Sequence, residues 1–254
     1  MSRKAIIIES SNVAGESDLP GARVDQKNWI NFLKSELGGA WEDGEIISLT
    51  KPFSSVLEKH LEDHKDKYCF VAFSGHGCDG SVVLNDSFKN YPISRLKPHG
   101  EKGSMVVDSC RGVEAAAQFS FAAKQLLIEG AERGRSVIAN SRQGEFTKFA
   151  AEEGKIPKRF DHGVRWRVAL LNSKVGIVEM LACSKGEAAG ENPKAGGYYT
   201  SLLLQSADLW QQAGGVGEVH STRAAHDHAA KKIPPQQTPE YKPQGLTFPF
   251  AVSV

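Results

Sequence analysis

A histidine and a cysteine in this chain each follow an apolar segment, at positions where the two could react together. His76 lies just after the apolar segment 68–73, and Cys110 lies just after the apolar segment 104–107, thirty-four residues further along. In open parallel α/β sheets, reactive groups gather beyond the carboxyl ends of the strands. Two neighbouring strands would therefore present an imidazole and a thiol side by side. This arrangement suits a cysteine nucleophile, because a histidine can take the thiol proton and generate the reactive thiolate.

The residues around this pair fit the same chemistry. His76 would act as the general base and later as the acid that protonates a leaving amine. Gly77 has no side chain, so its N–H can approach a substrate and form a two-donor oxyanion hole with the N–H of Cys110. The alternative is a turn histidine and a buried core cysteine, since free cysteine is often buried. Cys78 is expected to be a bystander in the loop, because no strand presents it.

The bulk composition narrows the class of protein. The chain has 254 residues, of which 40% are hydrophobic and 24% charged, with a formal net charge of +1. Such a near-neutral balance predicts no binding to nucleic acid or to an anionic membrane. We find no signal peptide, and no apolar stretch approaches the roughly 18 residues of a membrane helix. The four cysteines lack zinc-ligand spacing. A large chain with few cysteines and no secretion signal is expected to be a reduced, cytoplasmic protein.

Strand and helix patterns alternate along the chain, and this alternation predicts an α/β fold with a mainly parallel sheet. The expected strands are 5–9, 45–49, 68–73, 104–107 and 175–183, and the expected helices are 24–37, 56–64, 113–129 and 198–212. A hairpin is expected at 80–86, beside the reactive pair. Residues 130–165 carry scattered charge and are interpreted as a long connection. We find no internal repeat and expect one domain over 1–254.

The motifs together resemble the caspase-like cysteine peptidases, more closely the metacaspases and paracaspases than the animal caspases. The matching segments are 19–25, 73–77, 107–112, 181–187, 197–203 and 248–250, in family order. The resemblance implies a caspase-like three-layer sandwich, with a mainly parallel central sheet flanked by helices. It also implies a large-subunit-like part at about 1–130, the connection at about 130–165 and a small-subunit-like part at about 166–254. A stand-alone bacterial member of the family is expected.

The resemblance to paracaspases further implies an acidic specificity pocket built from Asp25, Asp108 and Glu187. Asp108 precedes Cys110 by two residues, so both side chains point to the same side of their strand. Three carboxylates around one cleft repel each other unless a cation joins them, which favours cleavage after Arg or Lys. Asp25 could instead serve the first turn of its helix. Glu187 could be a solvated loop residue, and Glu191 is its rival for the pocket.

No cofactor and no metal site are predicted. The candidates for a metal are Asp161-His162, His220 and His226-Asp227-His228. His226 and His228, however, lie two apart on an expected helix and point to different faces. Many metacaspases require calcium, and calcium activation stays open for this chain.

The leading hypothesis is a cysteine endopeptidase that acts through a Cys110–His76 dyad and a thioester. Its substrate would be a protein or peptide with Arg or Lys before the cleaved bond. A catalytically inactive homologue that serves as an interaction scaffold is the alternative, and a different thiol-dependent hydrolase or transferase is a remoter one. Self-cleavage within 130–165, a regulatory protein partner and a role as a proteolytic trigger in stress or defence are left open. The natural substrate and the oligomeric state are not indicated.

Overall fold

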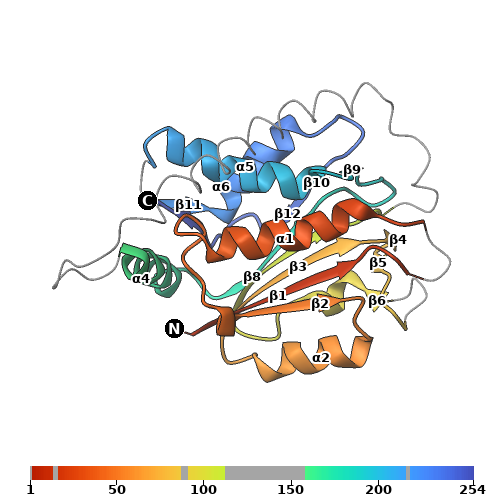
Figure 1. Cartoon of the computed structure of the whole chain (residues 1–254), viewed down its shortest axis with the longest axis horizontal. Helices are drawn as coiled ribbons and strands as arrows, with labels where there is room; N and C mark the ends of the chain where they lie inside the picture. Colours follow the sequence, from red (N-terminus) through yellow and green to blue (C-terminus); the bar gives the residue numbers. More distant parts are fainter. Residues whose placement is uncertain (1, 14–16, 87–90, 112–157, 216–217) are drawn as a thin grey trace, which may run out of the picture.

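A six-stranded sheet with the order β12-β8-β7-β3-β1-β2 forms the centre of the molecule (Figure 1). The computed structural model describes all residues except 1, 14–16, 87–90, 112–157 and 216–217. The strands of the sheet are β1 (Arg3–Ser10), β2 (Ile46–Thr50), β3 (Tyr68–Gly75), β7 (Lys102–Asp108), β8 (Gly176–Leu181) and β12 (Glu240–Lys242). All neighbouring strands run parallel except β12, which pairs antiparallel with β8 at one edge.

Helices cover both faces of this sheet, because the central strands carry apolar side chains on both faces. The central strand β3 is buried along its whole length, as expected for a parallel strand with both faces covered. Helices α1 (Pro20–Lys34), α4 (Lys158–Leu171), α5 (Tyr198–Gln212) and α6 (Thr222–Lys232) pack on one face. Helix α2 (Ser54–Asp63) covers the opposite face through Leu57 and Leu61 (Figure 1). The predicted three-layer α/β architecture is confirmed.

Helix α1 carries one of the predicted pocket residues because of its spacing. Trp29 and Leu33 lie four residues apart and are both buried against the sheet. Asp25 precedes Trp29 by four residues, so it lies on the same face of the helix and is drawn into the interior. Pro20 occupies the first turn, where a missing N–H costs nothing. The helix begins and ends earlier than predicted, at Pro20 and Lys34.

Short antiparallel sheets supplement the central one. They comprise β4 (Gly77–Cys78) with β5 (Ser81–Val82) and β6 (Tyr91–Pro92), β9 (Glu191–Asn192) with β10 (Gly196–Gly197), and β11 (Val219–Ser221) with β13 (Pro249–Val252). Two 3-10 helices, η1 (Asp43–Glu45) and η2 (Ile93–Leu96), complete the described elements. The carboxyl-terminal apolar segment therefore pairs with β11 and does not join the central sheet. The edge strand beside β8 is β12, which is too short and too charged to stand out in the sequence.

The connection predicted over 130–165 is only partly described, and the described part differs from the expectation. Helix α4 begins at Lys158, so the chain is already helical inside that range. Its apolar signal is weak: among the side chains that the structure describes in this helix, the buried hydrophobic ones are Trp166 and Leu170, while Val168 stays exposed. Trp166 packs edge-on against Trp41, with ring centroids 5.1 Å apart. The helix expected at 113–129 lies outside the described residues.

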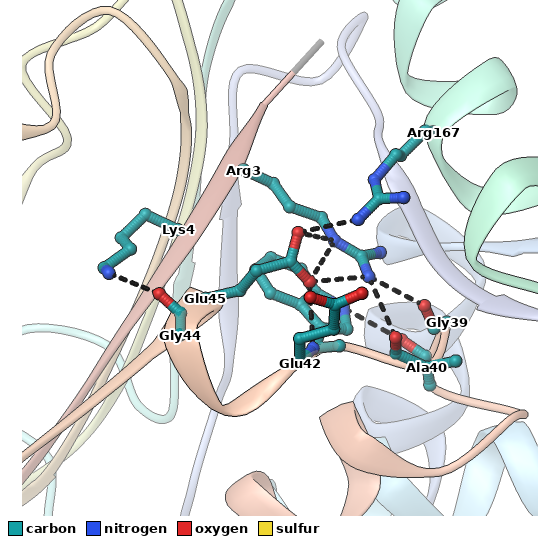
Figure 2. Close-up of polar contacts among 10 residues, drawn as sticks. Arg3, Lys4, Gly39, Ala40, Glu42, Gly44, Glu45 and Arg167 are labelled. Carbon is teal, nitrogen blue, oxygen red and sulfur yellow. Dashed lines mark hydrogen bonds and ion pairs between the residues drawn. The ribbon is translucent and has the colours of Figure 1, made fainter. Parts of the chain in front are cut away.

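A buried arginine joins three elements beneath the amino ends of the strands (Figure 2). Arg3 on β1 donates from Nε and Nη2 to the Glu45 carboxylate, at 3.0 to 3.2 Å, and from Nη2 to the carbonyl oxygen of Gly39 at 2.9 Å. Arg167 on α4 donates to the same carboxylate at 2.8 Å. The Arg3 guanidinium also lies 4.3 Å from the ring centroid of Trp41. These contacts connect α4 to β1 through the Glu45 carboxylate.

Candidate active site

The ends of β3 and β7 bring the two predicted reactive residues to one place. The strands are adjacent and parallel, with Ser74 opposite Asp108. His76 directly follows the end of β3, and Cys110 lies two residues beyond the end of β7. The segments touch, because a Cβ added to Gly77 would lie 2.8 Å from the carbonyl oxygen of Cys110. A side chain at position 77 would therefore push the two segments apart.

A backbone carbonyl orients the ring of His76. The Nε2 atom lies 2.6 Å from the carbonyl oxygen of Ser17. A carbonyl oxygen can only accept a hydrogen bond, so Nε2 carries the proton in this contact. Nδ1 is then the nitrogen that can receive a proton from a thiol. Sequence reasoning missed Ser17, because the contribution of a main-chain carbonyl leaves no trace in residue type.

The thiol of Cys110 is partly buried. Sγ lies 3.6 Å from the carbonyl oxygen of Ala189, to which it donates. Burial raises the pKa of the thiol, the backbone of Ala189 lowers it, and the charges of Asp108 and Glu191 raise it further. Formation of the thiolate therefore requires a base. The candidate is His76, which follows the end of the neighbouring strand β3.

Asp25 and Asp108 are far apart in the sequence, and in the structure both carboxylates lie against Gly197. The N–H of Gly197 donates to both carboxylate oxygens of Asp25, at 2.9 and 3.0 Å. A Cβ added to Gly197 would lie 2.2 Å from Oδ2 of Asp108. The Ser74 hydroxyl donates to Asp25 Oδ2 at 2.6 Å, and the N–H of Thr200 donates to Asp108 Oδ2 at 2.9 Å. Only a glycine allows both carboxylates to sit this close to one Cα.

Both carboxylates are closed to solvent, and this changes their acidity. Asp25 is 0% exposed and Asp108 is 5% exposed. Burial raises the pKa of Asp25 well above its ordinary value, and the charge of Asp108 adds to the increase. Burial also raises the pKa of Asp108 to about 6, although the N–H of Thr200 opposes this. Among the described residues, neither carboxylate forms an ion pair.

Glu191 and Glu187, the rivals for the third acidic position, have different surroundings. Glu191 lies on β9, and burial raises its pKa, opposed by the N–H groups of Gly21 and Ala22 at the start of α1. The charge of Asp108 raises it further, so Glu191 belongs electrostatically to the acidic pair.

The Glu187 carboxylate is instead occupied by the backbone of its own loop and the segment before β12. It accepts hydrogen bonds from the N–H of Ser184 at 3.0 Å, the N–H of Thr238 at 2.7 Å and the hydroxyl of Thr238 at 2.9 Å. The structure therefore brings Asp25, Asp108 and Glu191 together, and it leaves Glu187 outside this group.

Two of the histidines considered as metal ligands in the sequence have hydrogen-bond partners. His226 Nδ1 lies 2.7 Å from the Tyr199 hydroxyl, and His220 Nε2 lies 3.1 Å from the Ser206 hydroxyl. Burial lowers the pKa of both imidazoles to about 4. Cys78 lies on β4 and is partly exposed. Within the described part of the chain, no group of three or more His, Cys, Asp or Glu side chains could hold a metal ion. No described helix is long and apolar enough to cross a membrane.

Comparisons with known proteins agree with this architecture. The family model for the caspase domain matches residues 2–251, so the chain belongs to the caspase-domain family of cysteine peptidases. Among solved structures, caspase-1 from Spodoptera frugiperda is similar over 94% of this chain and 87% of that one, with a TM-score of 0.56 and 14% sequence identity. At this identity the similarity concerns the fold alone. No curated protein sequence matches the chain significantly.

Proposed function

We propose that this chain is a cysteine endopeptidase that cleaves peptide bonds after arginine or lysine. The observation that carries the proposal is the pair of buried carboxylates, Asp25 and Asp108, placed beside the strand end that bears Cys110. Two buried acids without a cation are costly, because desolvation and mutual repulsion both oppose ionisation. A guanidinium or ammonium group removes that cost, and arginine can pair with carboxylates through two parallel hydrogen bonds. Glu191, rather than Glu187, is the third acid of this pocket.

The reaction begins when His76 Nδ1 takes the proton of the Cys110 thiol. The thiolate attacks the carbonyl carbon of the scissile bond, and the carbonyl electron pair moves to oxygen. The N–H groups of Gly77 and Cys110 would donate to this oxyanion, and the loss of one such donor typically costs about 3 kcal/mol of transition-state stabilisation. Collapse expels the amine, which takes its proton from the His76 imidazolium, and leaves a thioester. Water then attacks the thioester while His76 accepts its proton, which releases the acid and restores the thiolate.

Substrate entry requires a movement in the acidic pocket. Gly197 lies directly against Asp108, and both carboxylates are shielded from solvent in the described state. Strands β9 and β10 carry Glu191 and Gly197, so this hairpin is the element that must yield to a cationic side chain. The bound side chain would then replace the proton that burial favours on the acidic pair.

The decisive experiment is a panel of fluorogenic peptides that differ only in the residue before the cleaved bond. The wild-type chain is expected to cleave the arginine and lysine peptides and to leave the aspartate and glutamine peptides intact. The Cys110→Ala variant should cleave none of them. Turnover of the aspartate peptide without turnover of the arginine peptide would contradict the proposed specificity for arginine and lysine. Equal turnover by wild type and Cys110→Ala would contradict the assignment of Cys110 as the nucleophile.

A further inference from the structure

The loop of residues 183–189 forms one wall around the nucleophile. Its last residue, Ala189, places its carbonyl oxygen 3.6 Å from Cys110 Sγ. The loop also pairs with the backbone just after the nucleophile: the N–H of Arg111 donates to the carbonyl oxygen of Glu187 at 2.9 Å, and the N–H of Gly186 donates to that of Arg111 at 3.1 Å. The position of the 183–189 loop therefore sets the surroundings of the thiol.

A single side chain holds the two ends of this loop together. Gln237 is 2% exposed and lies between α6 and β12, after a turn closed by its N–H and the carbonyl oxygen of Pro234 at 3.0 Å. Its Nε2 donates to the carbonyl oxygen of Ala182 at 2.9 Å, where the loop begins. Its Oε1 accepts from the N–H of Gly190 at 3.0 Å, where the loop ends. Gly190 adjoins Ala189, whose carbonyl faces the thiol.

The chemistry of this bridge requires an amide. The side chain must donate to one buried backbone group and accept from another, and a neutral primary amide offers both in one plane. Glutamate keeps the acceptor but loses the donor toward Ala182. Methionine has a similar length and lacks both strong hydrogen-bonding groups, which would leave the Ala182 carbonyl and the Gly190 N–H buried without a partner.

We propose that Gln237 is a positioning residue for the nucleophile. Its side chain links the two ends of the 183–189 loop and thereby holds the Ala189 backbone against Cys110. This role of Gln237 rests on the proposed function only because it takes Cys110 as the reactive group. Gln237 lies more than a hundred residues from Cys110 in the sequence and contacts neither the thiol nor His76 in the described hydrogen bonds. It acts through the loop.

The test measures the alkylation rate of Cys110 by iodoacetamide as a function of pH, read by mass spectrometry of the Cys110 peptide. Because the Ala189 backbone is the hydrogen-bond partner of the thiol, release of the loop should change the pH at which the rate is half-maximal. A pKa change of about one unit alters the thiolate fraction, and hence the rate at neutral pH, by up to about tenfold. We expect a change of this size in Gln237→Met and in Gln237→Glu. Cys78 in the same samples serves as the internal reference and should react at an unchanged rate.

Gln236→Met is the matched control, since Gln236 is the exposed neighbour, and its alkylation profile should match the wild type. Thermal unfolding checks that each variant is folded. If Gln237→Met does not fold, Gln237→Glu carries the test, because it keeps the oxygen that accepts from Gly190. Folded Gln237 variants with the wild-type profile would overturn the proposal. Failure of both variants to fold would also overturn it, by assigning Gln237 to stability. The reagent is small and uncharged, so the result stands even if arginine peptides are not cleaved.

Discussion

Asp25 and Asp108 come from α1 and β7 and meet at one residue, Gly197. The glycine N–H donates to Asp25, and its Cα lies so close to Asp108 that an added Cβ would be 2.2 Å from Oδ2. The two acids thus share one buried environment, in which the charge of Asp108 raises the pKa of Asp25. This shared environment gives the candidate site its acidic character, and its effects can be measured.

Replacement of Asp25 by asparagine keeps the shape of the side chain and removes its charge. If the pocket binds a cation, kcat/KM for an arginine peptide should fall about tenfold to a hundredfold, the value of one charged hydrogen bond. Asp227→Asn, which changes an exposed carboxylate on α6, is the control and should behave as the wild type. An unchanged kcat/KM in Asp25→Asn would exclude this residue from the pocket.

The two glutamates can be separated by a matched pair of variants. Glu191→Gln should lower kcat/KM for arginine peptides several-fold relative to a neutral peptide, since Glu191 shares the electrostatic environment of Asp108. Glu187→Gln should leave the preference for arginine unchanged and should lower the unfolding temperature, because it weakens the contacts with Ser184 and Thr238. Kinetics and thermal unfolding of both variants check this, and the reverse pattern would return Glu187 to the pocket.

The stability of the protein should depend on the ionisation of Asp108. Its pKa in the folded state is about 6, against 3.8 for an ordinary aspartate. Between these values the folded chain holds the proton and the unfolded chain has released it, so the contribution of Asp108 to stability is lost as the pH rises through about 6. Asp108→Asn should therefore be more stable than wild type at pH 8, by about 3 kcal/mol, and closer to wild type at pH 4.

Urea unfolding at both pH values measures this difference. Asp227→Asn again provides the comparison, and its stability relative to wild type should not follow the same trend. A gap between Asp108→Asn and wild type that stays constant with pH would show that folding does not raise the pKa of Asp108.

The cluster around Arg3 predicts a stability effect without a catalytic one (Figure 2). Arg3→Met leaves the Glu45 carboxylate without its most buried partner, and the loss of one member of a buried pair typically costs about 3 kcal/mol or more. Lys4→Met removes an exposed contact to the Gly44 carbonyl and should cost little. Urea unfolding compares the two, and the activity per folded molecule should be unchanged because Arg3 lies at the opposite end of the strands from Cys110. Equal stabilities would mean that the Arg3 cluster is unimportant.

Much of the fold could be predicted because local patterns and burial agree. The apolar segments that became β1, β3 and β7 are buried on both faces, and their order along the chain leaves a parallel sheet as the simple solution. Helix α4 and strand β12 were not predicted, since α4 buries only a narrow face and β12 has three residues. Their positions depend on contacts with distant elements, such as the packing of Trp166 on Trp41.

Part of the candidate site could be predicted from the sequence, and the rest depends on the tertiary structure. Residue types and spacing alone predict His76 and Cys110 as the candidate reactive pair, because each follows a recognisable strand and only certain side chains can do nucleophilic chemistry. Only the tertiary structure shows that Glu191 and not Glu187 shares the environment of Asp108, that the Ser17 carbonyl contacts His76, and that Gln237 bridges Ala182 and Gly190. The physical reason is that carbonyls, amides and carboxylates are selected by where the chain places them, and such placement depends on contacts between residues that are remote in sequence.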